Sequence, residues 1–279
     1  MLAAAHAAYW AALASCGSAT VVFAIGTVFR KSLVMKLGGV VTAAAFVMLT
    51  VALALRWSAT GHGPYLGRHE ALASYSWALI GFYLLLQWRI FRARAAGLIV
   101  APTSFFMLGV AALSPAAAQF ESPAMRSTWL WVHVGMAKVA VASLLLAAGI
   151  SALSLRRSLA RPRRLTGPSG PGAQESGLEQ VEELSVRLVS LGFLVLAVVI
   201  GAGALWANTA WGSYWSWDPI ETWSLATWVL YGMALHLYHQ WHVTGVRWAW
   251  LNVSVLAVAA MLLLALWVLS LSPHWIYLS

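Results

Sequence analysis

Residues 186–206 read VRLVSLGFLVLAVVIGAGALW, a segment in which Arg187 is the only charged residue. About 20 residues of this kind are enough for an α-helix to cross a hydrocarbon core of about 30 Å. The whole chain is 61% hydrophobic and 9% charged, whereas about a quarter of the residues in a soluble domain are charged. Because lipid offers no partner to backbone N–H and C=O groups, a membrane segment must satisfy them internally, as a helix does. The sequence therefore predicts an all-α, polytopic integral membrane protein.

Seven further apolar segments of similar length accompany this one, so a helical bundle of about eight transmembrane helices is predicted. The helices are expected near residues 8–28, 36–57, 71–91, 96–114, 128–154, 186–206, 220–242 and 248–271. We expect a single membrane domain over residues 1–279, because no polar segment is long enough to fold as a separate soluble domain. The longest polar stretch, residues 155–185, is rich in Pro, Gly and Ser. It is predicted to be a flexible cytoplasmic linker whose acidic end begins the sixth helix.

The net charge of +9 is spread over helix ends rather than gathered in one patch, so no nucleic-acid partner is expected. Loops on one side hold thirteen Lys and Arg residues, and loops on the other side hold three. Since cytoplasmic loops are enriched in Lys and Arg, the richer side is predicted to be cytoplasmic and both termini extracytoplasmic. The chain is expected to cross the lipid bilayer of the inner (plasma) membrane. The thirteen residues are Arg30, Lys31, Lys36, Arg89, Arg92, Arg94, Arg156, Arg157, Arg161, Arg163, Arg164, Arg187 and Arg247.

A tryptophan-rich segment, WGSYWSWDPIETWSLATW, follows at residues 211–228 and lies on the predicted outer side. Trp and Tyr are common at membrane interfaces, so an aromatic belt is one interpretation. A belt spreads its rings over many helix ends, whereas here the rings crowd one outer loop, residues 206–221, and the helix that follows. Flat apolar faces in such number favour a platform for a large planar ligand such as a metalloporphyrin. The rings concerned are Trp206, Trp211, Tyr214, Trp215, Trp217, Trp223 and Trp228.

Two carboxylates stand at the end of this loop, in the sequence Asp218-Pro219-Ile220-Glu221. Asp at the N-cap, Pro at the first helical position and Glu at the third form the capping box that starts many helices. This structural role is the favoured interpretation for Asp218, with contact to a bound cofactor as the alternative. For Glu221 the two interpretations remain equally open.

Three histidines are candidate iron ligands. His133 and His274 fall at the predicted outer ends of the fifth and eighth helices. Two such imidazoles facing each other across a porphyrin form a standard bis-histidine haem site, although a lone interfacial histidine is usually only amphipathic. His236 lies sixteen residues after Pro219, about 24 Å along a helix. An ionisable group at that depth is a functional-site candidate, with a second ligand expected from another chain.

Other polar residues on the outer side are less decisive. Lys138 falls inside the fifth span. Its amine is expected either to pair with a carboxylate or a haem propionate, or to extend toward the membrane interface. His62 and Glu70 flank a Gly- and Pro-containing loop, and their roles stay open. The candidates for binding haem propionates are the three outer arginines, Arg56, Arg68 and Arg126.

The chain has a single cysteine, Cys16, within the first apolar segment. One thiol excludes an intramolecular disulfide, a CxxC redox pair and a CxxCH site for covalent haem attachment to this chain. Any thiol chemistry must therefore involve the thiols of another protein.

The tryptophan-rich segment resembles the WWD signature of the CcsA/CcmC family of haem-handling proteins in cytochrome c biogenesis. GHGPYLGRHEALASYSW, residues 61–77, resembles the second outer loop of that family, and WVHVGM, residues 131–136, resembles its ligand-bearing helix start. Eight spans and the continuation ETWSLATWVLYGMALH are more similar to the CcsA branch of the two-component system than to the shorter CcmC. Two positions depart from the pattern. Ile220 stands where the family often has a basic residue, and the tail after Pro273 lacks the usual glycine-flanked histidine context.

The resemblance implies a cofactor, haem b (iron protoporphyrin IX), held on the outer side by His133 and His274. It also implies that His236 helps to receive haem from the cytoplasmic side, as a step in moving haem across the membrane. The implied partners are a CcsB/ResB-type membrane subunit and apocytochrome c. The chain would then present haem for covalent attachment to a CxxCH motif, as one component of a cytochrome c haem lyase. Two alternatives remain open: a haem-binding regulatory or assembly protein without lyase activity, and a small-molecule transporter gated by the tryptophan-rich loop.

Overall fold

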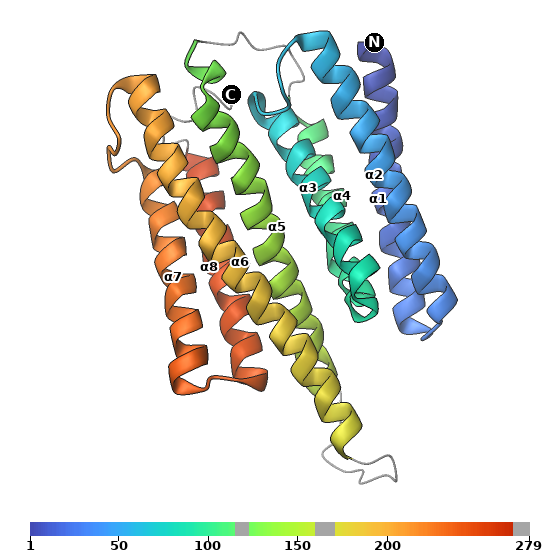
Figure 1. The fold of residues 1–279 in the computed structure, drawn as a ribbon. Helices are drawn as coiled ribbons and strands as arrows, with labels where there is room; N and C mark the ends of the chain where they lie inside the picture. Colours follow the sequence, from blue (N-terminus) through green and yellow to red (C-terminus); the bar gives the residue numbers. More distant parts are fainter. Residues whose placement is uncertain (115–122, 160–170, 270–279) are drawn as a thin grey trace.

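The computed structural model describes residues 1–114, 123–159 and 171–269, and within them the chain forms eight α-helices that run up and down (Figure 1). This architecture confirms the prediction of an all-α, polytopic membrane protein. Two short 3₁₀ helices precede α4 and α5. The elements are α1 (Leu2–Val28), α2 (Ser32–Thr60), α3 (Gly67–Arg89), η1 (Phe91–Ala96), α4 (Gly97–Ala112), η2 (Pro123–Arg126), α5 (Thr128–Leu159), α6 (Pro171–Trp211), α7 (Pro219–Trp241) and α8 (Gly245–Leu269).

Six of the described helices are long and apolar enough to cross a membrane. They are α1 to α6, with apolar spans that include Ser32–Thr60 and Glu179–Trp211. Helices α7 and α8 form where the seventh and eighth helices are predicted, and the described apolar part of α8 is the shorter segment Gly245–Met261. Glu221, Thr222 and Trp223 lie in the first turns of α7 and lower the mean hydropathy of that helix.

The predicted linker, residues 155–185, is shorter in the structure. Its acidic end belongs to the sixth helix, as expected, but α5 continues to Leu159 and α6 already begins at Pro171. The residues after Pro171 include Gln, Glu, Ala and Leu, which are strong helix formers. Val181 and Leu184 also pack against the buried core, so tertiary contacts favour the helix. Residues 160–170 lie outside the described part of the chain.

The helices form two groups, α1–α4 and α5–α8, and α3 packs against α5 where the groups meet (Figure 1). Small residues allow close helix approach within each group, as is common in membrane bundles. A Cβ added at Gly38 of α2 would lie 2.8 Å from the Phe23 ring of α1. A Cβ added at Gly192 of α6 would lie 2.5 Å from Leu144 of α5.

Connections at the two ends of the bundle differ in character. The N-terminus, the 61–66 loop and the tryptophan-rich loop share one end, which we call the aromatic end (Figure 1). The α1–α2 turn, η1, the start of α6 and the α7–α8 turn share the opposite, basic end. The grouping of loops follows the charge count, whereas the assignment of the basic end to the cytoplasm, and of the termini to the outside, stays a prediction.

A buried polar cluster joins α5, α6 and α8 near the basic end. The Asn252 side-chain amide donates to Ser151 Oγ at 3.0 Å and to Ser185 Oγ at 3.2 Å, and the two hydroxyls lie 2.9 Å apart. The Trp248 indole also donates to Ser185 Oγ, at 3.1 Å. Interhelical hydrogen bonds of this kind stabilise membrane bundles because the alternative is an unsatisfied polar group in a dry interior.

Replacing Asn252 with Ala should lower the free energy of unfolding by about 1 kcal/mol, since two interhelical donors are lost. Equilibrium unfolding in mixed detergent micelles measures the change. Ser15→Ala is the matched control, because the Ser15 hydroxyl bonds only to the Ala11 carbonyl of its own helix. Equal stability of the two variants would contradict a stabilising role for the cluster.

Candidate functional site

The tryptophan-rich loop spans residues 212–218, between the end of α6 at Trp211 and the start of α7 at Pro219. Gly212 begins the turn with a φ of +79°, and Trp217 near its end has a φ of +58°. A non-glycine residue in this left-handed region is uncommon and marks a backbone held by its surroundings.

The Trp217 side chain is 70% exposed and the Tyr214 side chain 57% exposed. The Trp215 ring meets the Trp217 ring edge to face, with centroids 5.8 Å apart. Apolar ring faces are thus presented outward.

Two carboxylates hold this loop in place. Asp218 Oδ1 accepts the Ile220 amide at 2.8 Å, and Glu221 Oε2 accepts the Asp218 amide at 3.2 Å. These bonds complete the capping box, so the favoured interpretation of Asp218 is confirmed. Glu221 Oε2 also accepts the Ser216 amide at 2.8 Å, so this carboxylate supports the loop backbone as well as the helix start.

Two of the predicted platform rings are packing residues. Trp206 is 4% exposed, and its indole donates to the Ala124 carbonyl at 3.0 Å. The Trp211 ring meets the Trp206 ring edge to face at 5.2 Å. Both rings pack with Leu130 at the start of α5 and with neighbouring apolar residues of the 61–66 loop and η2. These ring contacts therefore hold the end of α6 against the start of α5, next to the loop.

His133 lies in the first turns of α5 and faces α6. Its Nδ1 is 2.8 Å from the Val199 carbonyl oxygen. A carbonyl oxygen can only accept, so Nδ1 carries the proton and the ring lone pair is on Nε2. The ring fits against α6 because residue 203 is a glycine: a Cβ there would lie 2.8 Å from His133 Nδ1. A carbonyl partner on one ring nitrogen is the usual support of a histidine that binds metal through the other.

The structure separates other predicted residues from this group. Trp228 lies further along α7 and stacks on Phe193 of α6, with ring centroids 4.9 Å apart and an angle of 9°. His236 lies on an exposed face further along that helix, whereas Trp223 is half-buried near the start of α7 and so stays close to the loop in the chain. His274 lies outside the described residues. Of the predicted ligands, the structure therefore places only His133 beside the packing that supports the tryptophan-rich loop.

A buried ionic cluster at the aromatic end involves residues whose roles the sequence left open. Arg56 Nε donates to Glu70 Oε1 at 2.6 Å, and Glu70 is 2% exposed. The second oxygen, Glu70 Oε2, accepts the Leu66 amide at 3.2 Å and lies 3.6 Å from His62 Nδ1. Arg56, considered above for a propionate, thus braces the 61–66 loop through Glu70. Long-range pairing of this kind has no signature in sequence spacing.

Lys138 faces away from His133. Five residues along a helix correspond to a rotation of about 140°, and Lys138 accordingly lines a cavity of about 400 Å³ between α2, α3 and α5. Its Nζ lies 6.0 Å from the centroid of the Tyr75 ring. Lys138 therefore lies on the side of α5 that faces α2 and α3, whereas His133 faces α6.

The residues near the loop fit one side of a haem site. Exposed indole and phenol rings offer apolar faces for a porphyrin, and a half-buried imidazole with its lone pair on Nε2 is a suitable axial ligand. The capping bonds keep the loop in one shape, and Gly203 leaves room for the imidazole. Side chains and backbone held in place in this way lose less entropy when a ligand binds to them.

Comparison with known proteins gives close relatives. The chain is 38% identical to the cytochrome c biogenesis protein CcsA of Synechococcus sp. (strain CC9902) over 220 residues, or 70% of this chain and 71% of that protein. Its identity to CcsA of Porphyra purpurea is 32% over 244 residues, which cover 74% of this chain and 76% of the relative. CcsA of Guillardia theta is also 32% identical, over 245 residues and 81% of each chain.

Among solved structures, Cytochrome c Heme Lyase CcmF superposes with a TM-score of 0.69 at 15% sequence identity. The match covers 94% of this chain but only 46% of CcmF, so the chain spans less than half of that protein. At this identity the likeness shows a shared fold.

The family description Cytochrome C assembly protein matches residues 65–276, which include the 61–66 loop in part, His133 and the tryptophan-rich loop. With this match and homologous CcsA proteins aligned over most of its length, the chain belongs to the cytochrome C assembly protein family.

Proposed function

We propose that this chain binds haem b at its aromatic end and presents it for covalent attachment to apocytochrome c, as the membrane component of a haem lyase. The observation that carries the proposal is the hydrogen bond from His133 Nδ1 to the Val199 carbonyl. This bond fixes the imidazole with its lone pair on Nε2, the state that iron ligation requires. The names of the CcsA relatives, which are cytochrome c biogenesis proteins, support the same reaction class.

Each part of the site has a separate task in this proposal. His133 holds the iron from one side, and the exposed rings of Tyr214 and Trp217 cover the porphyrin face together with the half-buried ring of Trp215. Asp218 and Glu221 keep the loop in its shape through their amide contacts. When bound, haem supplies the vinyl groups to which the two CxxCH thiols add, each thiol giving its sulfur and its proton to one vinyl. The only thiol of this chain, Cys16, is 1% exposed inside α1, so catalysis by this chain consists of positioning.

Two further ligands belong to the proposal. His274 is the expected second axial ligand at the aromatic end. His236 is exposed on α7, and an ionisable side chain on the outer surface of a membrane helix is costly without a partner. A CcsB/ResB-type subunit that covers this face of α7 would relieve that cost and could complete a site through which haem enters the bundle from the cytoplasm.

Replacing His133 with Gly should remove most haem from the purified protein, and free imidazole should restore it by occupying the space of the lost ring. The Soret absorbance per protein measures bound haem, with an expected loss of about tenfold or more. His239→Gly is the control, because it carries the same cost of a helical glycine in an exposed residue at the basic end. Unchanged haem in His133→Gly would contradict the assignment.

Gly203→Ala should reduce haem binding without any change to a candidate ligand. The new Cβ would lie 2.8 Å from His133 Nδ1 and 2.9 Å from His133 Cε1, which forces the imidazole from its place. Gly201→Ala is the matched control on the same helix, where a Cβ meets no atom within 4 Å. We expect haem affinity to fall about tenfold in Gly203→Ala, a typical effect of a lost supporting contact. Equal affinity in both variants would show that the ring position has no bearing on haem.

Co-expression with a partner subunit and a CxxCH apocytochrome separates lyase activity from haem binding alone. Haem that stays with the cytochrome after denaturing electrophoresis reports covalent attachment. We expect attachment with the wild-type chain and a large loss with His133→Gly. Haem bound by this chain without attachment to any apocytochrome would favour the alternative, a regulatory or assembly protein of the same family.

A further inference from the structure

Two adjoining cavities lie at the basic end, where the α1–α4 group meets α5 and α6. The first has a volume of about 460 Å³ and lies between the α1–α2 turn, η1 and the end of α5. The second, about 200 Å³, lies between η1, α5 and the start of α6. Ala95 and Leu153 line both cavities, so the two spaces are neighbours on either side of these side chains.

The first cavity is strongly basic. Arg30 and Lys31 line it from the α1–α2 turn, and Arg156 lines it from α5. No acidic side chain is among the described residues of its wall, and these three cations form no ion pair within the described part of the chain. Arg30 has a left-handed backbone, with a φ of +53°. Three like charges that converge on one space repel each other, and an anion placed between them removes that repulsion.

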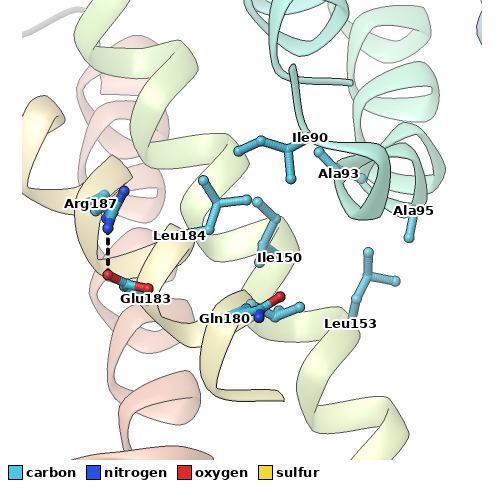
Figure 2. A pocket seen from close by; sticks show the side chains of 11 residues that line it. Ile90, Ala93, Ala95, Ile150, Leu153, Gln180, Glu183, Leu184 and Arg187 are labelled. Atoms are coloured by element: carbon cyan, nitrogen blue, oxygen red, sulfur yellow. Dashed lines mark hydrogen bonds and ion pairs between the residues drawn. The ribbon is translucent and has the colours of Figure 1, made fainter. Parts of the chain in front are cut away.

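The second cavity is apolar. Figure 2 shows Ile90, Ile150 and Leu184 directed into the space between η1, α5 and α6. Two charged residues at its edge, Glu183 and Arg187, neutralise each other through a contact of 2.5 Å. A cationic cavity and a largely apolar chamber thus lie side by side at this end of the bundle.

We propose that these two adjoining cavities together bind one anionic phospholipid. The phosphate lies between Arg30, Lys31 and Arg156, and an acyl chain enters the chamber beside Ile90, Ile150 and Leu184. Basic pockets between transmembrane helices are suited to acidic lipid headgroups, and the ends of α1, α2 and α5 lie where a bilayer places its phosphates. The lipid would contact both helix groups, so it would also stabilise their association. This site is separate from the haem site at the opposite end of the bundle.

The test uses the full chain in nanodiscs of phosphatidylcholine with increasing phosphatidylglycerol, and native mass spectrometry counts the lipids retained after detergent release. The variant carries Arg30→Gln, Lys31→Gln and Arg156→Gln. The matched control carries Lys36→Gln, Arg89→Gln and Arg247→Gln, which remove the same charge from exposed residues of the same end that line neither cavity. We expect the first variant to bind phosphatidylglycerol about tenfold more weakly than wild type, and the control to stay close to wild type.

Leu153→Trp tests the apolar chamber, because a larger ring fills the junction and leaves all three cations in place. It should reduce retained phosphatidylglycerol, and inorganic phosphate should not compete with the lipid in the wild type.

The single variant Arg156→Gln supplies a milder test if the triple variant folds poorly, which helical circular dichroism reports. Three results would each overturn the proposal. The charge variant and its control bind phosphatidylglycerol equally well, the wild type retains phosphatidylcholine as well as phosphatidylglycerol, or inorganic phosphate alone displaces phosphatidylglycerol from the wild type.

Discussion

Helices α5 and α6 approach each other closely along much of their length because two glycines of α6 leave room for side chains of α5. Gly203 receives the His133 ring, and Gly192 receives Leu144. Further along the same contact, the Ser151 and Ser185 hydroxyls are 2.9 Å apart. A helix pair in lipid gains little from hydrophobic burial, so close packing and interhelical hydrogen bonds must hold it. The position of the candidate haem ligand is therefore a consequence of how these two helices pack.

The same helix pair carries the tryptophan-rich loop. α6 ends in Trp206 and Trp211, which pack against the start of α5 and anchor the base of the loop. The capping box of α7 then fixes the other end, where Asp218 and Glu221 accept backbone amides. Between these anchors the exposed rings of Tyr214 and Trp217 stand at the aromatic end. Aromatic residues of one segment thus divide into rings that hold the loop and rings that remain available to a ligand.

Several features follow directly from sequence. Helix number and order follow from hydropathy, because each membrane segment must satisfy its own backbone. The capping box follows from Asp218-Pro219-Ile220-Glu221, since its bonds are local.

Other features depend on which face a helix turns toward its neighbours. Trp228 packs on Phe193 rather than beside the loop, and Lys138 lines a cavity on the opposite side of α5 from His133. A pattern read along one helix does not contain that information, and the extent of α6 before residue 185 likewise depends on contacts with α5.

The most direct measurement is an electron cryo-microscopy map of the haem-loaded protein with its partner subunit. We expect the iron to be bonded to His133 Nε2 while Nδ1 remains hydrogen-bonded to the Val199 carbonyl, with the porphyrin face against the rings of the tryptophan-rich loop. A map with haem bound away from the aromatic end of the bundle, or with the His133 imidazole turned away from the iron, would contradict this account.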